Sequence, residues 1–235
     1  MSITENVKSI LERIELAAKA AGVSAGDVSL VAATKMNDAA AVAEAISAGV
    51  SACGENRVQE LITKNAQNAY AGAPIHFIGH LQKNKVNQVV GICDIIESVD
   101  SAELLELINK RAALLGIKQS VLLEVNIAGE DSKSGLLPDE LERVLSKAAD
   151  YPSVLVRGLM AIPPISSKKG ENRPYFAGMY KLSVDIRKKK YDNVFMDFLS
   201  MGMSGDFEDA IAEGSNMVRV GSAIFGARTY PQSAI

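Results

Sequence analysis

The sequence predicts an α/β protein, a single (β/α)8 (TIM) barrel with an extra N-terminal helix, spanning residues 1–235. Eight short apolar segments alternate along the chain with segments whose apolar residues recur at helical spacing. The apolar segments are nearly continuous, which is typical of parallel strands buried on both faces. No Gly/Ser-rich linker or shift in composition divides the chain, so we expect one domain. An open, doubly wound sheet is the alternative arrangement for the same pattern.

The first element is an amphipathic helix over residues 4–21, which Thr4, Glu5 and Asn6 are expected to cap. The predicted strands then follow in chain order at 28–35, 51–56, 76–80, 94–99, 120–126, 154–160, 198–203 and 217–221. Helices are predicted between them at 39–48, 58–69, 102–115, 138–149, 174–188 and 207–212, with a short segment at 85–90 and a last helix from 223. This strand-then-helix rhythm is the basis for the barrel prediction.

Composition and charge exclude several classes of protein. A formal net charge of -3 argues against a dedicated nucleic-acid binder. No apolar run approaches the roughly 18 residues that a membrane helix needs, and the N-terminus lacks the features of a signal peptide. Cys53 and Cys93 make no disulfide framework, and the spacing of His76 and His80 does not suit a metal site. We therefore expect a cytoplasmic protein without nucleic-acid, membrane or metal partners.

Lys35 ends the first predicted strand. A period of two places Ser29, Val31, Ala33 and Lys35 on one face of that strand, with an apolar wall beneath the lysine. A desolvated lysine has a lowered pKa and becomes a usable nucleophile or Schiff-base former. The alternative is a lysine that extends from the strand end into solvent.

Two glycine/serine turns follow the last two predicted strands. They are Ser204-Gly205-Asp206 and Gly221-Ser222. The loops at these two positions often hold a phosphate in barrels of this class, on backbone N–H groups and a helix N-terminus. Such turns are also common without any ligand, which is the alternative interpretation.

Arg219 shares a strand face with Met217 and Gly221, so we expect it to point into the barrel beside the second turn. A guanidinium there stays charged and only donates hydrogen bonds. The alternative is an arginine paired with a barrel carboxylate such as Glu124.

Seven segments in family order resemble one family along nearly the whole chain. They are Val31–Lys35, Gly54–Glu60, His76–Lys85, Glu124–Glu130, Arg157–Ile162, Leu199–Ser204 and Val218–Gly226. The sequence is similar to the YggS/PROSC family of pyridoxal 5'-phosphate (PLP) homeostasis proteins, relatives of the N-terminal barrel of alanine racemase.

The resemblance implies a fold-type III PLP-binding barrel and a role for each candidate residue. Lys35 would hold PLP as a Schiff base, and Ser204, Gly221 and Ser222 would contact its phosphate. Arg219 would contact the pyridine nitrogen, and Asn56 would lie near the ring. An arginine cannot accept a hydrogen bond from a protonated pyridine nitrogen, so it keeps that nitrogen unprotonated and weakens the ring as an electron sink.

We expect a protein without catalytic turnover that buffers or delivers PLP, with PLP-dependent apo-enzymes as its partners. Alanine racemase needs a second domain that supplies a tyrosine base, and this sequence ends at Ile235, nine residues after Gly226. Of the six tyrosines, Tyr230 alone follows a predicted strand closely. A single-domain amino-acid racemase is the alternative, and a scaffold with structural PLP is a third possibility. The resemblance also implies a monomer.

Overall fold

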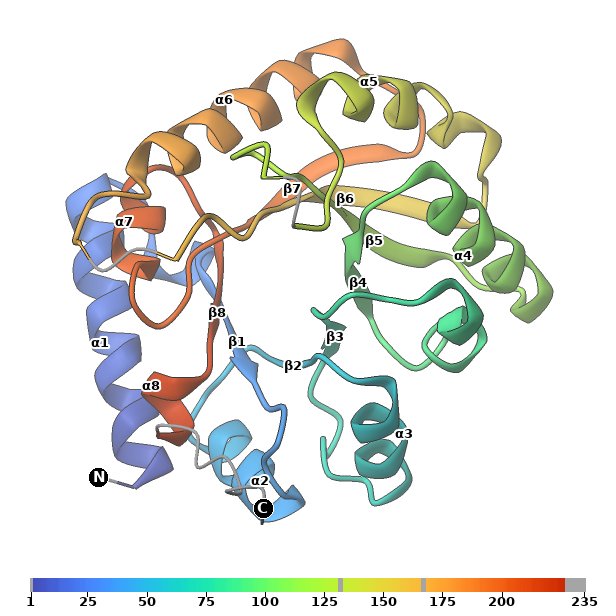
Figure 1. Ribbon diagram of the computed structural model, residues 1–235. Helices are drawn as coiled ribbons and strands as arrows, with labels where there is room; N and C mark the ends of the chain where they lie inside the picture. The colour runs from blue at the N-terminus through green and yellow to red at the C-terminus, as the bar shows by residue number, and fades with distance from the viewer. Residues whose placement is uncertain (1, 131–132, 166–167, 227–235) are drawn as a thin grey trace, which may run out of the picture.

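The computed structural model describes residues 2–130, 133–165 and 168–226, and in it eight parallel strands close into a barrel (Figure 1). The strands are β1 (Ser29–Ala33), β2 (Ala52–Glu55), β3 (Ile75–Phe77), β4 (Ile95–Val99), β5 (Gln119–Glu124), β6 (Val154–Met160), β7 (Val194–Ser200) and β8 (Met217–Val220). Each strand pairs with the next in the chain, and β8 returns to β1 with Arg219 opposite Val31. The predicted barrel is confirmed, and the open sheet is excluded because no strand edge remains unpaired in this sheet.

Helices surround the barrel and follow most of the strands (Figure 1). They are α1 (Ile3–Ala21), α2 (Ala39–Ser47), α3 (Val58–Ala66), α4 (Ala102–Leu115), α5 (Pro138–Ser146), α6 (Arg173–Lys189), α7 (Phe207–Ala212) and α8 (Ser222–Phe225). Three 3-10 segments complete the set: η1 (Ala25–Asp27), η2 (Lys83–Gln88) and η3 (Ala148–Asp150). The connection after β3 is thus a 3-10 segment, and the fifth predicted helix ends at Ser146 before a 3-10 turn.

The extra helix α1 begins at Ile3, one residue before the predicted start, and its cap is not among the predicted residues. Ser2 is the N-cap, and its hydroxyl accepts a hydrogen bond from the Glu5 backbone while the Glu5 carboxylate accepts one from the Ser2 backbone. This reciprocal pair satisfies N–H groups that a helix start otherwise leaves unpaired. The opposite face of α1 buries Val7, Ile10 and Ile14 against the barrel wall.

The strand β7 begins four residues before its predicted start. The strand begins at Val194 and ends at Ser200, before the predicted end at 203. Its first residues are partly exposed, and Asp197 pairs with Arg157 of β6, so this stretch lacks the continuous apolar pattern of a buried strand. The pairing also shifts register beside Gly158, where a Cβ would lie 1.8 Å from the Phe198 carbonyl oxygen. Only glycine allows that approach.

Alternation along each strand separates the barrel interior from its outer layer. One apolar cluster fills the interior and takes one residue from each of six strands: Val31, Ala52, Ile95, Leu122, Met160 and Met217. The neighbouring residues Leu30 and Val218 pack outward against helices instead. Val31 and Met217 therefore carry the same interior face on which the alternation places Lys35 and Arg219.

Candidate functional site

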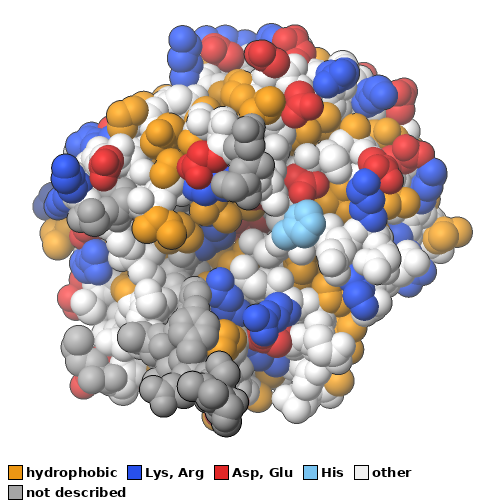
Figure 2. All heavy atoms as spheres, in the orientation of Figure 1, with side chains coloured by type: hydrophobic (Ala, Val, Ile, Leu, Met, Phe, Trp, Pro, Cys, Tyr) orange, Lys and Arg blue, Asp and Glu red, His pale blue; other side chains and the backbone are white. Residues whose placement is uncertain are grey.

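A cavity of about 290 Å³ opens at the carboxyl ends of the strands. Its walls are formed by Ala33, Lys35, Asn56, Ile78, Ile162, Met203, Ser204, Gly205, Arg219, Gly221 and Ser222. All six residues that the sequence singled out are among them, although they come from four different strand ends. The space-filling view shows a recess near the middle of the molecule, with Lys and Arg side chains beside it (Figure 2).

Lys35 is the second residue after β1 and is half-buried in the cavity wall. Its backbone carbonyl accepts a hydrogen bond of 3.0 Å from the Asn37 side chain. The preceding residue, Thr34, is fully buried and faces outward, as the alternation requires. The lysine therefore lines the cavity and does not extend freely from the barrel.

Asn56 lies next to Gly79, which approaches its backbone very closely. A Cβ at Gly79 would lie 2.3 Å from the Asn56 carbonyl oxygen, so a larger residue would displace Asn56 from the cavity wall. The side-chain oxygen of Asn56 is buried and has no hydrogen-bond partner among the described residues. Leaving such an acceptor unpaired has a free-energy cost, and a ligand with a donor group at this wall would remove it.

The two predicted turns meet on one side of the cavity. The Ser204 hydroxyl accepts hydrogen bonds of 3.3 Å from the backbone N–H groups of Gly221 and Ala223. These N–H groups begin α8, so backbone donors and a hydroxyl converge at one point. Hydroxyl and backbone N–H donors of this kind suit the oxygens of a phosphate.

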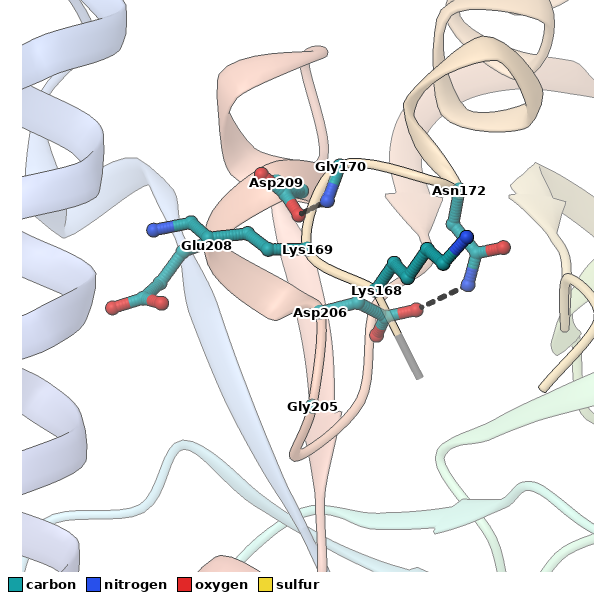
Figure 3. Close-up of a pocket in the computed structure, with 8 residues that line it drawn as sticks. All are labelled: Lys168, Lys169, Gly170, Asn172, Gly205, Asp206, Glu208 and Asp209. Carbon is teal, nitrogen blue, oxygen red and sulfur yellow. Dashed lines mark hydrogen bonds between the residues drawn. The ribbon is translucent and has the colours of Figure 1, made fainter. Parts of the chain in front are cut away.

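Asp206 braces the first turn from outside the cavity. Its carboxylate accepts a hydrogen bond from the Met203 backbone at 2.7 Å. It accepts another from the Asn172 side chain at 2.8 Å (Figure 3). A second pocket of about 240 Å³ lies on that outer side and shares Gly205 with the first cavity. The turn that presents Ser204 is thus anchored to the start of α6.

Arg219 projects into the barrel and is almost fully buried. It donates to the Ser200 hydroxyl and, at 3.0 Å, to the Ala161 carbonyl. The carboxylate within ion-pair distance is that of Glu97 on β4, at 3.8 Å, and not that of Glu124. The arginine thus does lie near a barrel carboxylate, as the alternative expected, but that carboxylate is Glu97 of β4, across the barrel from β8, and not the example Glu124.

Glu97 is the centre of a buried network beneath the cavity. Its two oxygens interact with His76 Nδ1 and Ser200 Oγ, each at 2.6 Å. Burial acts to raise the pKa of Glu97, but His76, Arg219 and Ser200 together hold it below the ordinary value. We call His76, Glu97, Ser200 and Arg219 the inner cluster. Of these four, sequence reasoning singled out Arg219 alone; the signal that could have revealed the rest is Glu97, an acidic residue inside a strand of apolar residues.

Glu124 is the last residue of β5. Among the described residues, its carboxyl group has no short side-chain hydrogen bonds like those of Glu97 to His76 and Ser200. Burial raises the pKa of Glu124 to about 7, and Asp100 adds to the rise, while Arg219 and His80 oppose it. This carboxyl therefore titrates near neutrality, in contrast to Glu97.

A second charged network lies behind β1, on the outer face of the sheet. Glu55 Oε1 accepts from Lys64 Nζ at 2.7 Å, from Thr34 Oγ1 at 2.6 Å and from the Tyr70 hydroxyl at 3.3 Å. We call Thr34, Glu55, Lys64 and Tyr70 the outer cluster. Sequence reasoning missed it, since Lys64 has the spacing of an ordinary exposed helix residue.

Three further observations bear on the expected partners. In residues 2–130, 133–165 and 168–226, no group of three or more His, Cys, Asp or Glu side chains is placed to hold a metal ion. None of the helices that the structure describes combines the length and apolarity that a membrane crossing requires. Tyr230, considered above as a possible base, lies outside the described residues.

Comparison with known proteins identifies the family. Residues 6–229 match the family model described as the N-terminal domain of alanine racemase. A pyridoxal phosphate homeostasis protein of Aquifex aeolicus (strain VF5) is 39% identical over 230 residues, which cover 98% of this chain and 100% of that protein.

Two solved structures are similar over nearly their full length. A crystal structure of an unknown protein from Bifidobacterium adolescentis is 42% identical, with a TM-score of 0.89 and coverage of 95% of this chain and 94% of that one. PipY of Synechococcus elongatus PCC7942, solved with PLP bound, is 35% identical, with a TM-score of 0.80 and coverage of 92% and 100%. The chain therefore belongs to the alanine racemase N-terminal domain family and, within it, to the pyridoxal phosphate homeostasis proteins.

Proposed function

We propose that this protein binds PLP on Lys35 and acts without catalytic turnover in PLP homeostasis, by buffering or delivering the cofactor. The observation that carries the proposal is the convergence of Lys35, Asn56, Arg219 and both phosphate turns on one cavity. The names of the relatives and the PLP bound to PipY support it.

Each wall of the cavity has groups that fit one part of PLP. The Lys35 amine would bind the aldehyde carbon covalently, and Ser204, Gly221 and Ser222 would hold the phosphate. Arg219 would meet the pyridine nitrogen, and the unpaired Asn56 oxygen would accept a donor near the ring. When bound, PLP supplies an electrophilic carbon for amines and an electron sink, which the charged guanidinium weakens.

The chemistry of the wall supports binding without turnover. Of the described residues that line the cavity, Lys35 and Arg219 are the ionisable ones, and a guanidinium in a protein does not give up its proton. Lysine is then the one general base of that set. Racemisation by two bases needs a second proton-transfer group on the opposite face of the substrate.

The direct test of binding is a visible spectrum followed by borohydride reduction and peptide mass mapping. We expect a yellow protein with a phosphopyridoxyl group on Lys35, and loss of both signals in Lys35→Ala. Lys85→Ala, a lysine outside the cavity wall, serves as the matched control and should keep the adduct. A colourless protein, or an adduct spread over many lysines, would refute the proposal.

Deuterium exchange at the α-carbon of amino acids separates this function from the racemase alternative. Exchange of amino acids in D2O at enzyme-like rates would overturn the non-catalytic role. Complementation with Lys35→Ala addresses the scaffold alternative, since a scaffold keeps its cellular function without the lysine and a carrier loses it.

We further propose that residues 1–235 form one domain that acts as a monomer in the cytoplasm and meets PLP-dependent apo-enzymes there. The two cysteines, Cys53 and Cys93, are both free and buried, which is in keeping with a reducing compartment. Size-exclusion chromatography with light scattering tests the oligomeric state.

A further inference from the structure

The residues on either side of Lys35 are both held by one neighbouring helix, α3. We propose that Glu60 and Lys64 of this helix are positioning residues that direct the Lys35 side chain into the cavity. The inference rests on the proposed function, because it concerns the lysine that would carry PLP.

Glu60 holds the residue after Lys35. Its Oε2 accepts a hydrogen bond of 2.6 Å from the Met36 backbone N–H. Met36 has a φ of 62°, in the left-handed region that a residue with a side chain rarely adopts. Two contacts hold it: the Asn37 N–H donates to the Thr34 carbonyl at 3.1 Å, which closes a turn over residues 34–37, and the Glu60 carboxylate fixes the Met36 N–H of that turn.

Lys64 holds the residue before Lys35. Its Nζ donates to the Thr34 carbonyl at 2.7 Å and pairs with Glu55 at the same distance. It also lies 3.6 Å from Glu60, four residues earlier on the same helix. Glu60 and Lys64, which lie one turn apart on α3 and close to each other, therefore bind the backbone on both sides of Lys35.

The long side chain of Lys35 lies between these two anchored residues, so its direction depends on them. A small rotation of the backbone at Lys35 moves an amine several bonds away by a much larger distance. Formation of a covalent bond needs the amine within about 3–3.5 Å of the reacting carbon and correctly aligned. Without the Glu60 contact, the turn over residues 34–37 would keep its own hydrogen bond but lose its connection to α3, and the Lys35 amine would lose its fixed direction.

The experiment compares two ligands that differ only at the reacting carbon. PLP has an aldehyde there, whereas pyridoxine 5'-phosphate has an alcohol and cannot bond to a lysine. Glu60→Leu and the smaller Glu60→Ala both remove the acceptor, whereas Glu60→Gln keeps an oxygen for the Met36 N–H. The matched control is Glu106→Leu, which removes an exposed Glu–Lys pair of the same spacing on α4.

We expect Glu60→Leu and Glu60→Ala to weaken the apparent affinity for PLP about tenfold, as loss of a hydrogen bond to a charged group would. Affinity for pyridoxine 5'-phosphate should not change, and Glu60→Gln and Glu106→Leu should behave as wild type. The adduct after brief borohydride reduction should shift from Lys35 towards other lysines in the two weakened variants. Circular dichroism confirms which variants are folded.

Two outcomes would overturn the inference while leaving the proposed function intact. One is wild-type PLP affinity in both Glu60 variants, and the other is an equal loss for both ligands, which indicates a general change in the cavity. If the wild-type protein itself formed no adduct on Lys35, the proposed function would fail first, and the two failures are thus distinguished.

Discussion

The inner and outer clusters each bury one carboxylate with one cation, yet they satisfy those charges differently. In the outer cluster, Lys64 contacts Glu55 directly at 2.7 Å, and Glu55 Oε2 has no partner among the described residues. In the inner cluster, Arg219 lies 3.8 Å from Glu97, and Ser200 bonds to both. Both oxygens of Glu97 are satisfied.

The difference follows from what each cluster faces. The outer cluster lies between the sheet and α3, where a direct ion pair ties helix to strand and also holds the Thr34 backbone. The inner cluster lies beneath the cavity, and Arg219 forms part of the cavity wall. The Arg219 guanidinium is held by the Ser200 hydroxyl and the Ala161 carbonyl and makes no short direct pair with a carboxylate of the described residues. It therefore stays in the cavity wall.

The largest effect is expected from breaking the direct pair. Lys64→Met keeps the aliphatic length but leaves Glu55 as a buried charge without its cation, which should lower the free energy of unfolding by about 3–5 kcal/mol. Urea unfolding followed by circular dichroism measures it. Lys110→Met, which breaks the exposed Glu106–Lys110 pair, should have little effect. Similar small losses in both variants would show that Lys64 is not a structural tie.

An intermediate effect on stability, which depends on pH, should distinguish the carboxyl groups of Glu124 and Glu97 in the barrel interior. Burial raises the pKa of Glu124 to about 7 in the folded protein, from about 4.5 in the unfolded chain. The protonated Glu124 side chain therefore contributes fully to stability below pH 4.5, and this contribution is lost as the pH rises through 7. Glu124→Gln should therefore stabilise the protein at pH 8 by at most roughly 3 kcal/mol, at about 1.4 kcal/mol per pKa unit, and not at pH 4.

Glu97→Gln should change the stability at pH 8 in the opposite direction. The pKa of Glu97 is lowered by its partners, so its contribution is present above the unfolded value and is lost as pH falls through the folded one. This variant should be less stable than wild type at pH 8, and the deficit should shrink in acid. Urea midpoints at the two pH values test both variants, and a shift of the same sign in both would contradict the contrast.

The smallest effect is expected at the serine that joins the inner cluster. Ser200→Ala removes bonds to two charged groups and should lower the free energy of unfolding by about 2 kcal/mol. Ser215→Ala is the matched control, because Ser215 is equally buried but bonds only to backbone carbonyls and should cost about 1 kcal/mol. Equal losses in urea would mean that the charge of the partners does not matter here.

Much of the fold was predictable because its information is local. The bounds of α4 and β6 agree with the prediction, since each has an unbroken pattern and clear neighbours. The first strand residues of β7 were missed because Asp197 interrupts the pattern, and its pairing with Arg157 is a contact between strands. The N-cap Ser2 was missed because the capping residue lay outside the apolar pattern.

The sequence by itself determined the alternation of strands and helices and, through the period of two, the interior placement of Lys35 and Arg219. It also marked Ser204, Gly221 and Ser222 by strand order. Only the tertiary structure decided which carboxylate Arg219 meets, and that Lys64 and Glu60 hold the residues beside Lys35. The reason is physical: side-chain alternation is a property of one strand, whereas ion pairs between elements depend on register and helix rotation, which only the packed barrel sets.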